Sequence, residues 1–215
     1  MNQLSEIRIP IGDVTVEGNL TLLKNTRGIV VFAHGSGSSR FSPRNQYVAR
    51  YFNSQKISTL LFDLLTPQEE QIDLITAEYR FNIDLLAQRL VGATEWLRNA
   101  PATKNFKLGY FGASTGAAAA LITAAKLPRA VVTVVSRGGR PDLAGEYLRQ
   151  VKAPTLLLVG GWDTEVIQLN RIAQNQMTNF NKLEIIPEAT HLFEEPGKLE
   201  EVAKISTQWF THYLL

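Results

Sequence analysis

Apolar runs and amphipathic stretches alternate along the chain, and their order predicts the order of its strands and helices. Short, mostly apolar runs predict strands, and the continuous β-branched run 28–33 is typical of a strand that is buried on both faces. These runs cover residues 28–33, 57–62, 108–111, 130–135, 155–159 and 183–186. Apolar positions at helical spacing between them predict helices that pack on a sheet. These helices cover residues 43–53, 83–97, 116–127, 143–151, 164–177 and 202–213.

Two further patterns complete the predicted fold. Ser5–Pro10 and Val14–Leu23 alternate apolar and polar residues on either side of Gly12-Asp13, which predicts an antiparallel hairpin. Thr66-Pro67-Gln68-Glu69 has the pattern of a capping box and predicts a short helix within the long connection 64–80. The alternation of strand and helix predicts an α/β protein with a doubly wound, mostly parallel sheet and helices on both faces. The 215 residues fit a single domain, residues 1–215.

The pentapeptide Gly112-Ala113-Ser114-Thr115-Gly116 stands between a predicted strand and a predicted helix of small residues. Gly-x-Ser-x-Gly at a strand, sharp turn and helix is the pattern of a nucleophile elbow. Glycine at both ends lets the strand and helix backbones approach each other, because a side chain there would clash. Ser114 is then expected in a strained backbone conformation with its hydroxyl above the sheet. Thr115 begins the helix, so its backbone N–H is a free donor.

A serine hydroxyl becomes a good nucleophile only when a base takes its proton and a third group orients that base. Asp163 and His191 each follow a later predicted strand, so both should lie at the same edge of the sheet as Ser114. The chain has three histidines, and His34 precedes the elbow while His212 lies inside the closing helix. We therefore predict a triad of Ser114, Asp163 and His191.

Each partner of the serine also has a structural interpretation. Asp163 could serve only as the N-cap of the helix over 164–177. His191 could be a loop histidine that caps the closing helix. Asp142 is a rival acid because it also follows a strand, although that strand comes one position earlier than the usual order requires.

Composition restricts the class of protein. The 22 basic and 20 acidic residues give a net charge of +2 without a basic run longer than a pair, so neither nucleic acid nor a membrane is an expected partner. The absence of cysteine excludes disulfides, thiolate zinc sites and a cysteine nucleophile. The N-terminus lacks a signal-peptide pattern, and the longest apolar stretch, 116–125, is too short to span a bilayer. We expect a cytoplasmic monomer or homodimer without a metal or organic cofactor.

The pentapeptide, His34-Gly35-Ser36-Gly37, Asp163 and His191 together resemble the α/β-hydrolase superfamily. The compact length, with no large lid, is similar to its dienelactone hydrolase-like branch, and the resemblance covers essentially the whole chain. One departure concerns the nucleophile, because the namesake enzymes use cysteine where this chain has Ser114. This departure favours a serine esterase and argues against dienelactone itself as substrate.

The resemblance also implies an oxyanion hole made of two backbone N–H groups, those of Ser36 and Thr115. Two such donors stabilise the negative oxygen of a tetrahedral intermediate, and loss of one typically lowers turnover by about 10²–10³. Gly35 and Gly37 would let this backbone approach the substrate. His34 is expected to be structural, holding the loop without titrating during catalysis.

The polar turn predicted over 136–142 contains Arg137 and Arg140, where related hydrolases insert a lid. Two arginines beside a catalytic crevice could bind a substrate carboxylate through paired hydrogen bonds. The alternative is that they pair with Asp142, Glu146 or solvent, which contributes little.

These residues predict a serine hydrolase that cleaves a carboxylic ester, lactone or thioester of a small molecule. His191 would deprotonate Ser114 as it attacks the carbonyl, and Asp163 would orient the imidazole. Trp162, beside Asp163, is a candidate substrate contact. The alternative from another class is a catalytically silent ligand-binding or interaction protein on a hydrolase scaffold.

Overall fold

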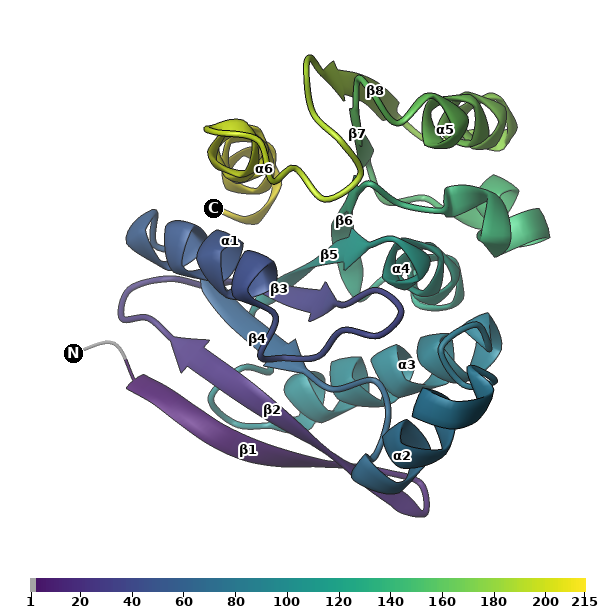
Figure 1. Ribbon diagram of the computed structural model, residues 1–215. Helices are drawn as coiled ribbons and strands as arrows, with labels where there is room; N and C mark the ends of the chain where they lie inside the picture. The colour runs from purple at the N-terminus through teal and green to yellow at the C-terminus, as the bar shows by residue number, and fades with distance from the viewer. Residues whose placement is uncertain (1–2) are drawn as a thin grey trace.

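The computed structural model describes residues 3–215, and within them one eight-stranded sheet lies between two layers of helices (Figure 1). The strands are β1 (Gln3–Ile11), β2 (Val14–Leu22), β3 (Gly28–Ala33), β4 (Ser58–Phe62), β5 (Lys107–Ala113), β6 (Val131–Arg137), β7 (Thr155–Gly160) and β8 (Asn181–Ile186). The helices are α1 (Pro43–Ser54), α2 (Pro67–Thr76), α3 (Ile83–Asn99), α4 (Thr115–Lys126), α5 (Thr164–Gln176), α6 (Lys198–Leu214) and the 3₁₀ segment η1 (Pro141–Gln150). Residues 1 and 2 lie outside this description, and the assignment of 1–215 to a single domain stays a prediction.

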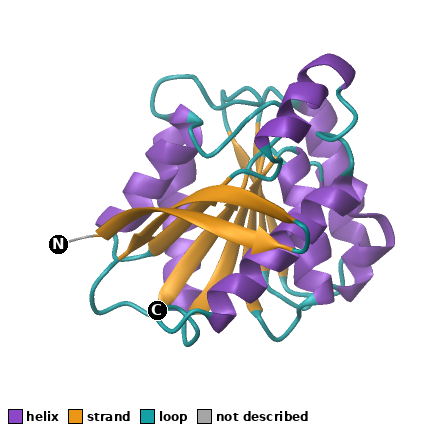
Figure 2. Ribbon diagram, turned by 90° about the horizontal axis from the view of Figure 1, so that it is seen from below, coloured by secondary structure: helices purple, strands orange, loops and turns teal. Residues whose placement is uncertain are grey.

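The sheet has the strand order β1-β2-β4-β3-β5-β6-β7-β8. β1 pairs antiparallel with β2, and β2 pairs antiparallel with β4. All other neighbours, from β4 across to β8, are parallel. Figure 2 shows the β1–β2 hairpin crossing in front of the other strands. The predicted doubly wound, mostly parallel sheet with an N-terminal antiparallel hairpin is confirmed, and η1 is the only helical element that the described residues insert between β6 and β7.

Helices α1 and α6 cover one face of the sheet, and α3, α4, η1 and α5 cover the other (Figure 1). The core under α1 and α6 is aromatic, with contacts between the rings of Phe32, Phe52, Phe111 and Phe210. None of the helices in residues 3–215 combines the length and apolar character that crossing a bilayer requires.

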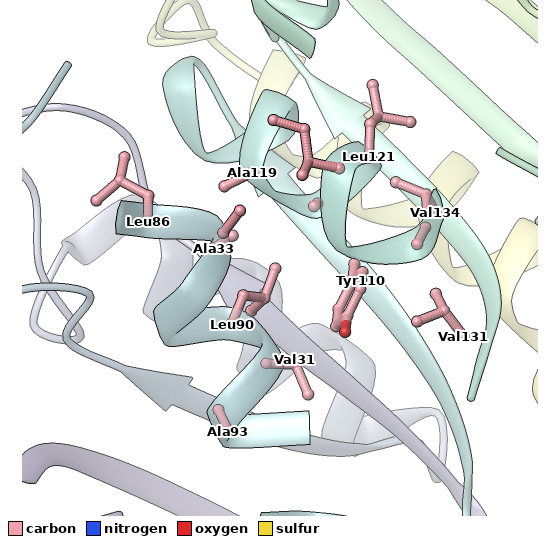
Figure 3. Packing of buried hydrophobic residues seen from close by; sticks show 14 of the residues in the cluster. Val31, Ala33, Leu86, Leu90, Ala93, Tyr110, Ala119, Leu121, Val131 and Val134 are labelled. Atoms are coloured by element: carbon pink, nitrogen blue, oxygen red, sulfur yellow. The ribbon is translucent and has the colours of Figure 1, made fainter. Parts of the chain in front are cut away.

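Helix α4 packs closely on the sheet because its buried side chains are small. Ala117–Ala120 are fully buried, and Figure 3 shows Ala119 and Leu121 in one cluster with Tyr110 of β5. The buried Tyr110 hydroxyl shares a hydrogen bond of 2.5 Å with Thr94 Oγ1 of α3. This packing fixes the N-terminus of α4 at the carboxyl end of β5, where Ser114 lies.

The long connection 64–80 contains α2, as the capping-box pattern predicts. Thr66 Oγ1 accepts a hydrogen bond from the Glu69 N–H at 3.2 Å, and Glu69 Oε2 accepts one from the Thr66 N–H at 2.7 Å. Both partners of the predicted capping box are therefore in place.

Two predicted boundaries after β6 are wrong. The turn predicted over 136–142 begins later, because Ser136 and Arg137 still pair with β5 on one side and β7 on the other. The α-helix predicted over 143–151 is instead the 3₁₀ segment η1, interrupted at Gly145 where φ is 52°. Arg137 consequently belongs to the sheet and does not lie on a flexible turn.

Candidate active site

Ser114 lies at the turn between β5 and α4 in a backbone conformation that is rare for a residue with a side chain. Its φ is 50° and its ψ is −123°. Such a conformation costs on the order of 1–3 kcal/mol and persists only where the surroundings enforce it. Here the Ser114 N–H donates to the Arg137 carbonyl (3.4 Å), and its own carbonyl accepts from the N–H groups of Ala117 (3.1 Å) and Arg140 (3.0 Å). The predicted sharp turn with Ser114 at its tip is present.

The two glycines of the pentapeptide permit the close approach on which this turn depends. A Cβ at Gly112 would lie 2.5 Å from Ala117 Cα, and a Cβ at Gly116 would lie 2.2 Å from the Ala33 carbonyl oxygen. No side chain fits at either position. The predicted steric role of both glycines is confirmed.

His191 and Asp163 come together at the carboxyl edge of the sheet. His191 Nδ1 lies 2.6 Å from Asp163 Oδ2. Asp163 is the N-cap of α5, but its side chain makes no capping hydrogen bond, so the interpretation of Asp163 as only a helix cap is wrong. The contact directs the Nδ1 proton toward Asp163 and leaves Nε2 available as a proton acceptor.

Gly138 brings the His191 loop against the segment that holds Ser114. A Cβ at Gly138 would lie 3.0 Å from the His191 carbonyl oxygen and 3.5 Å from His191 Cε1. The preceding residue, Arg137, accepts the Ser114 N–H. The hydrogen bonds within residues 3–215 do not include one between Ser114 Oγ and His191 Nε2, so direct contact of nucleophile and base belongs to the proposal below.

The loop after β3 lies against the elbow, as the oxyanion-hole prediction requires. A Cβ at Gly35 would be 3.0 Å from Ser114 Cβ. Ser36 Oγ lies 3.3 Å from the Arg80 carbonyl oxygen and 3.0 Å from Thr115 Oγ1. Since a carbonyl oxygen cannot donate, the Ser36 hydroxyl donates to Arg80 and accepts from Thr115. The two residues predicted to supply the oxyanion donors are thus joined through their side chains.

His34 is a buried structural residue, as predicted. Its Nδ1 donates to the Gly35 carbonyl at 3.0 Å, and its Nε2 accepts the Leu64 N–H at 3.0 Å. Burial lowers the pKa of His34, outweighing the hydrogen bond to Gly35 and the charge of Asp63, which raise it. A neutral ring with one donor and one acceptor satisfies both backbone partners and fixes the loop that leads to Ser36.

Arg140 binds Asp142 in a two-pronged ion pair. Arg140 Nε lies 2.9 Å from Asp142 Oδ1, and Nη2 lies 2.8 Å from Oδ2. This is the pairing that the alternative interpretation of the two arginines expected. It also engages Asp142, the rival acid, while Asp163 contacts His191. A contact between Arg140 and substrate stays a prediction.

Arg137 and Trp162, the other predicted substrate contacts, have opposite environments. Arg137 is only 6% exposed, and its Cζ lies 5.8 Å from the centre of the Phe193 ring. Trp162 is 60% exposed beside Asp163 and can be reached from solvent. Both positions are compatible with a ligand near the strand ends, and neither tests the prediction.

Sequence reasoning missed the residues that fix the Arg80 carbonyl to which Ser36 donates. The buried Asp73 accepts the Arg80 N–H (2.8 Å) and pairs with its guanidinium (2.6 Å). Burial alone would raise the pKa of Asp73, but the hydrogen bonds from Arg80 and Tyr79 and the guanidinium charge hold it below its ordinary value. The only sequence signal was the length of the 64–80 connection, which suggested function without naming a residue.

Two more residues that the sequence did not single out support loops beside Ser114. Asn170 of α5 is buried and donates to the Gly139 carbonyl at 3.0 Å. Glu195 Oε2 accepts the N–H of Thr190, the residue before His191, at 3.1 Å. Neither could be distinguished beforehand, because asparagine and glutamate are ordinarily exposed.

The loops around Ser114 enclose little empty space. A cavity of about 50 Å³ lies behind the Ser36 loop, with His34, Leu64 and Arg80 among its lining residues. Its size suits ordered water and not a substrate. Among the described residues, no group of three or more His, Cys, Asp or Glu side chains is arranged to hold a metal ion.

Comparison with known proteins identifies the family. The model of the dienelactone hydrolase family matches residues 49–213. The chain belongs to the dienelactone hydrolase family. A crystal structure of dienelactone hydrolase from Anabaena variabilis is 55% identical with a TM-score of 0.98, and the match covers 100% of this chain and 99% of that one. Est1E from Butyrivibrio proteoclasticus shares the fold at 13% identity, with a TM-score of 0.80 over 96% of this chain and 98% of that one. The resemblance to the α/β-hydrolase superfamily and to this branch is confirmed.

The curated relatives in this family are longer proteins. Two from Mycobacterium tuberculosis, strains CDC 1551 / Oshkosh and ATCC 25618 / H37Rv, are each named "Putative phosphoribosyl transferase". Each is 54% identical over 209 residues, and the match covers 97% of this chain and 46% of the relative. The chain thus spans about half the length of these curated relatives. Membership of the dienelactone hydrolase family, together with the fold, supports hydrolase chemistry for the matched part.

Proposed function

We propose that this protein is a serine hydrolase that cleaves a carboxylic ester, lactone or thioester through an acyl-enzyme on Ser114. The observation that supports this most strongly is the 2.6 Å contact between His191 Nδ1 and Asp163 at the strand edge that also holds Ser114. A histidine oriented through Nδ1 can accept a proton at Nε2, which is what a serine nucleophile needs.

In the proposed reaction His191 Nε2 takes the Ser114 proton as Oγ forms a bond to the carbonyl carbon. The imidazolium then gives this proton to the leaving alkoxide or thiolate as the bond from the carbonyl carbon to that group breaks. Water then attacks the acyl carbon and loses a proton to Nε2. The imidazolium returns this proton to Ser114 Oγ as the bond between Oγ and the acyl carbon breaks, which releases the carboxylic acid. Asp163 keeps the imidazole in the required tautomer and stabilises its cation.

The backbone N–H groups of Ser36 and Thr115 would bind the negative carbonyl oxygen in both tetrahedral intermediates. The 3.0 Å contact between the Ser36 and Thr115 hydroxyls supports this assignment, because it links the two loops that carry the donors. The Ser36 hydroxyl also donates to the Arg80 carbonyl, and Arg80 is held by its ion pair with Asp73. These contacts fix the position of the Ser36 loop. Donors held in advance need no reorganisation when the charge develops.

We assign the transferase name of the curated relatives to the part of those proteins outside the match. The 209 matched residues contain Ser114, Asp163 and His191, and more than half of each relative lies elsewhere. The exposed Trp162 is proposed as an apolar surface against which the substrate lies.

The test is a panel of 4-nitrophenyl esters, thioesters and lactones of varied acyl length and charge, assayed with the purified protein and with Ser114→Ala. We expect turnover of at least one class by the parent and a loss of at least 10³-fold in the variant, as for a missing nucleophile. Turnover by Ser114→Ala within tenfold of the parent would remove Ser114 from this role. No turnover with any member of the panel would instead favour the catalytically silent ligand-binding protein.

A further inference from the structure

The strand β8 forms one edge of the sheet, and no other strand in residues 3–215 pairs with its outer side. Figure 1 shows β8 at the top of the molecule, between α5 and α6. The strand contains neither proline nor glycine. The opposite edge, β1, contains Pro10, which lacks the backbone N–H that a further strand would need. Of the two edges, β8 is therefore the one that keeps a full set of backbone donors.

The hydrogen bonds between β7 and β8 show which residues of β8 face the free side. The Phe180 carbonyl accepts the Thr155 N–H at 2.9 Å, so even-numbered residues of this strand direct their backbone groups toward β7. Successive residues of a strand alternate, and the N–H and C=O groups of Asn181, Leu183 and Ile185 therefore point outward. All three residues are partly exposed. The edge thus offers donors and acceptors to a further strand.

Two opposite charges lie close together on the α6 face of β8. Lys182 Nζ lies 2.7 Å from Glu184 Oε2, and the two side chains are 58% and 29% exposed. A lysine on an edge strand is one of the devices that keep edges from pairing. Here its charge is balanced two residues further along the same face, so the edge carries no net charge that would repel a second copy of the chain.

Antiparallel pairing of β8 with the same strand of a second copy brings these charges into register. With Leu183 on the two-fold axis, Lys182 lies opposite Glu184 of the second copy, and the same pair recurs on the other side of the axis. Both are pairs without mutual backbone hydrogen bonds, in which side chains approach most closely. An axis at Lys182 or at Glu184 would place like charges opposite each other, which is destabilising. The charges therefore select one register.

The surface beside β8 on the α6 face is hollow and partly aromatic. A groove of about 400 Å³ runs there, and Phe180, Trp209 and Tyr213 are among its lining residues. Phe180 is 65% exposed, and its ring stacks on that of Trp209 with 6.0 Å between the centres. The two-fold axis of such a pairing stands perpendicular to the sheet, so the grooves of both copies meet on one face. Their aromatic side chains would then be removed from water, as at the core of an interface.

We propose that the protein forms a symmetric homodimer through β8, in which one sheet continues across both copies and Leu183 lies on the two-fold axis. The partner is a second copy because the order of Lys182 and Glu184 along the strand is complementary to itself. This inference goes beyond the proposed hydrolase function and does not depend on it. It narrows the expectation of a monomer or homodimer to one defined interface.

The first test uses this self-complementarity, measured by sedimentation velocity from about 1 to 200 μM, a range suited to a modest interface. The parent should dimerise, as should the control Lys24→Glu, which changes the charge of an exposed lysine between β2 and β3. Lys182→Glu and Glu184→Lys should each raise the dissociation constant at least about tenfold, because two opposite-charge pairs become like-charge pairs.

Combining the two changes should restore the dimer. An equimolar mixture of Lys182→Glu and Glu184→Lys should form a heterodimer, and the variant that carries both substitutions should dimerise by itself, because opposite charges again face each other. This recovery also shows that the substituted chains are folded. A monomeric parent, a dimer that both single variants retain, or a mixture that stays monomeric would overturn the proposal.

A second test reads the register directly and uses the absence of cysteine from the chain. Lys182→Cys and Glu184→Cys are oxidised separately and as a mixture. The mixture should give a disulfide-linked dimer, because the Cα atoms of such a cross-strand pair lie about 4.5 Å apart, within the span of a disulfide. Each variant alone should stay largely unlinked, since its cysteine faces a charged side chain. Equal cross-linking in all three samples, or none in the mixture, would reject this register.

Discussion

Ser114 adopts a backbone conformation that glycine would adopt at lower cost. Its φ is 50° and its ψ is −123°. Hydrogen bonds of the Ser114 backbone to Arg137, Ala117 and Arg140, together with the close approach of β5 and α4, impose this conformation. The sequence predicted this strain from the Gly-x-Ser-x-Gly pattern between a predicted strand and a predicted helix. Retention of a serine in such a place is explained if its hydroxyl is used chemically, because the side chain adds strain without a stabilising hydrogen bond of its own to α4.

Ser114→Gly should therefore abolish ester turnover and raise the free energy of unfolding by about 1 kcal/mol, since relief of strain exceeds the entropy cost of glycine. Ser114→Ala should be equally inactive but should keep the strain and remain within about 0.5 kcal/mol of the parent. Urea unfolding of the three proteins measures the difference. A Ser114→Gly protein less stable than Ser114→Ala would mean that the elbow stores no strain.

Single substitutions also distinguish Asp163 from Asp142 as the acid that orients His191. Asp163→Asn should lower kcat by about 10⁴, because an amide favours the wrong tautomer of His191. Asp142→Asn should lower kcat less than tenfold, since Asp142 is bound to Arg140. Steady-state kinetics with the best ester of the panel compares them. Our assignment fails if Asp142→Asn shows the larger loss.

At the scale of elements, the contact between α4 and the end of β3 holds the elbow and the Ser36 loop together. Gly116 allows this contact, because a Cβ there would lie 2.2 Å from the Ala33 carbonyl oxygen and 2.4 Å from that of His34. Backbone atoms cannot move aside as the end of a side chain can. The geometry of Ser36 and Thr115 therefore depends on the absence of a side chain at Gly116.

Gly116→Ala should destabilise the protein by about 1–3 kcal/mol and lower kcat of the folded fraction, because α4 has to shift away from β3. Gly161→Ala is the matched control, since the nearest atom to a Cβ there is the Ile186 carbonyl oxygen at 3.2 Å. Thermal unfolding and active-site titration report stability and activity separately. Similar behaviour of both variants would show that close approach at Gly116 is unimportant.

Element boundaries were predicted well where local chemistry decides them and poorly where pairing decides them. Ser42 and Pro43 begin α1 as expected, with the Ser42 side chain accepting from Asn45. The end of β6 was misplaced because polar Ser136 and Arg137 look like a turn, although neighbouring strands hold both in the sheet. Pairing between distant strands leaves no local signal in the sequence. The buried state of Arg137 was missed for the same reason.

At the scale of the whole molecule, parallel strands bring distant loops to one edge. The loops after β3, β5, β7 and β8 supply Ser36, Ser114, Asp163 and His191 respectively. The order of the strands and of the residue types predicted Ser114, Asp163 and His191, whereas Ser36 was expected from the resemblance to α/β-hydrolases. The ion pair between Arg44 of α1 and Glu194, three residues after His191, could not be predicted, because it depends on how α1 lies against the His191 loop.

The buried His34 should make stability depend on pH. Burial lowers its folded pKa below the ordinary value of 6.5, so the unfolded chain takes up the proton first as pH falls. The free energy of unfolding should therefore decrease below about pH 6.5, by at most about 1.4 kcal/mol per pH unit from this group. His34→Gln, which cannot titrate, should lose this component. Urea unfolding of both proteins between pH 7 and 5 measures it, and equal slopes would contradict the expectation.

The measurement that tests the central claim most directly is reaction with a fluorophosphonate, followed by mass spectrometry of the labelled peptide. A serine activated by His191 should attack phosphorus, expel fluoride and carry the phosphonate on Ser114 alone. Labelling should disappear in Ser114→Ala and slow by several orders of magnitude in His191→Gln. A parent protein that stays unlabelled, or that is labelled at another residue, would contradict the account.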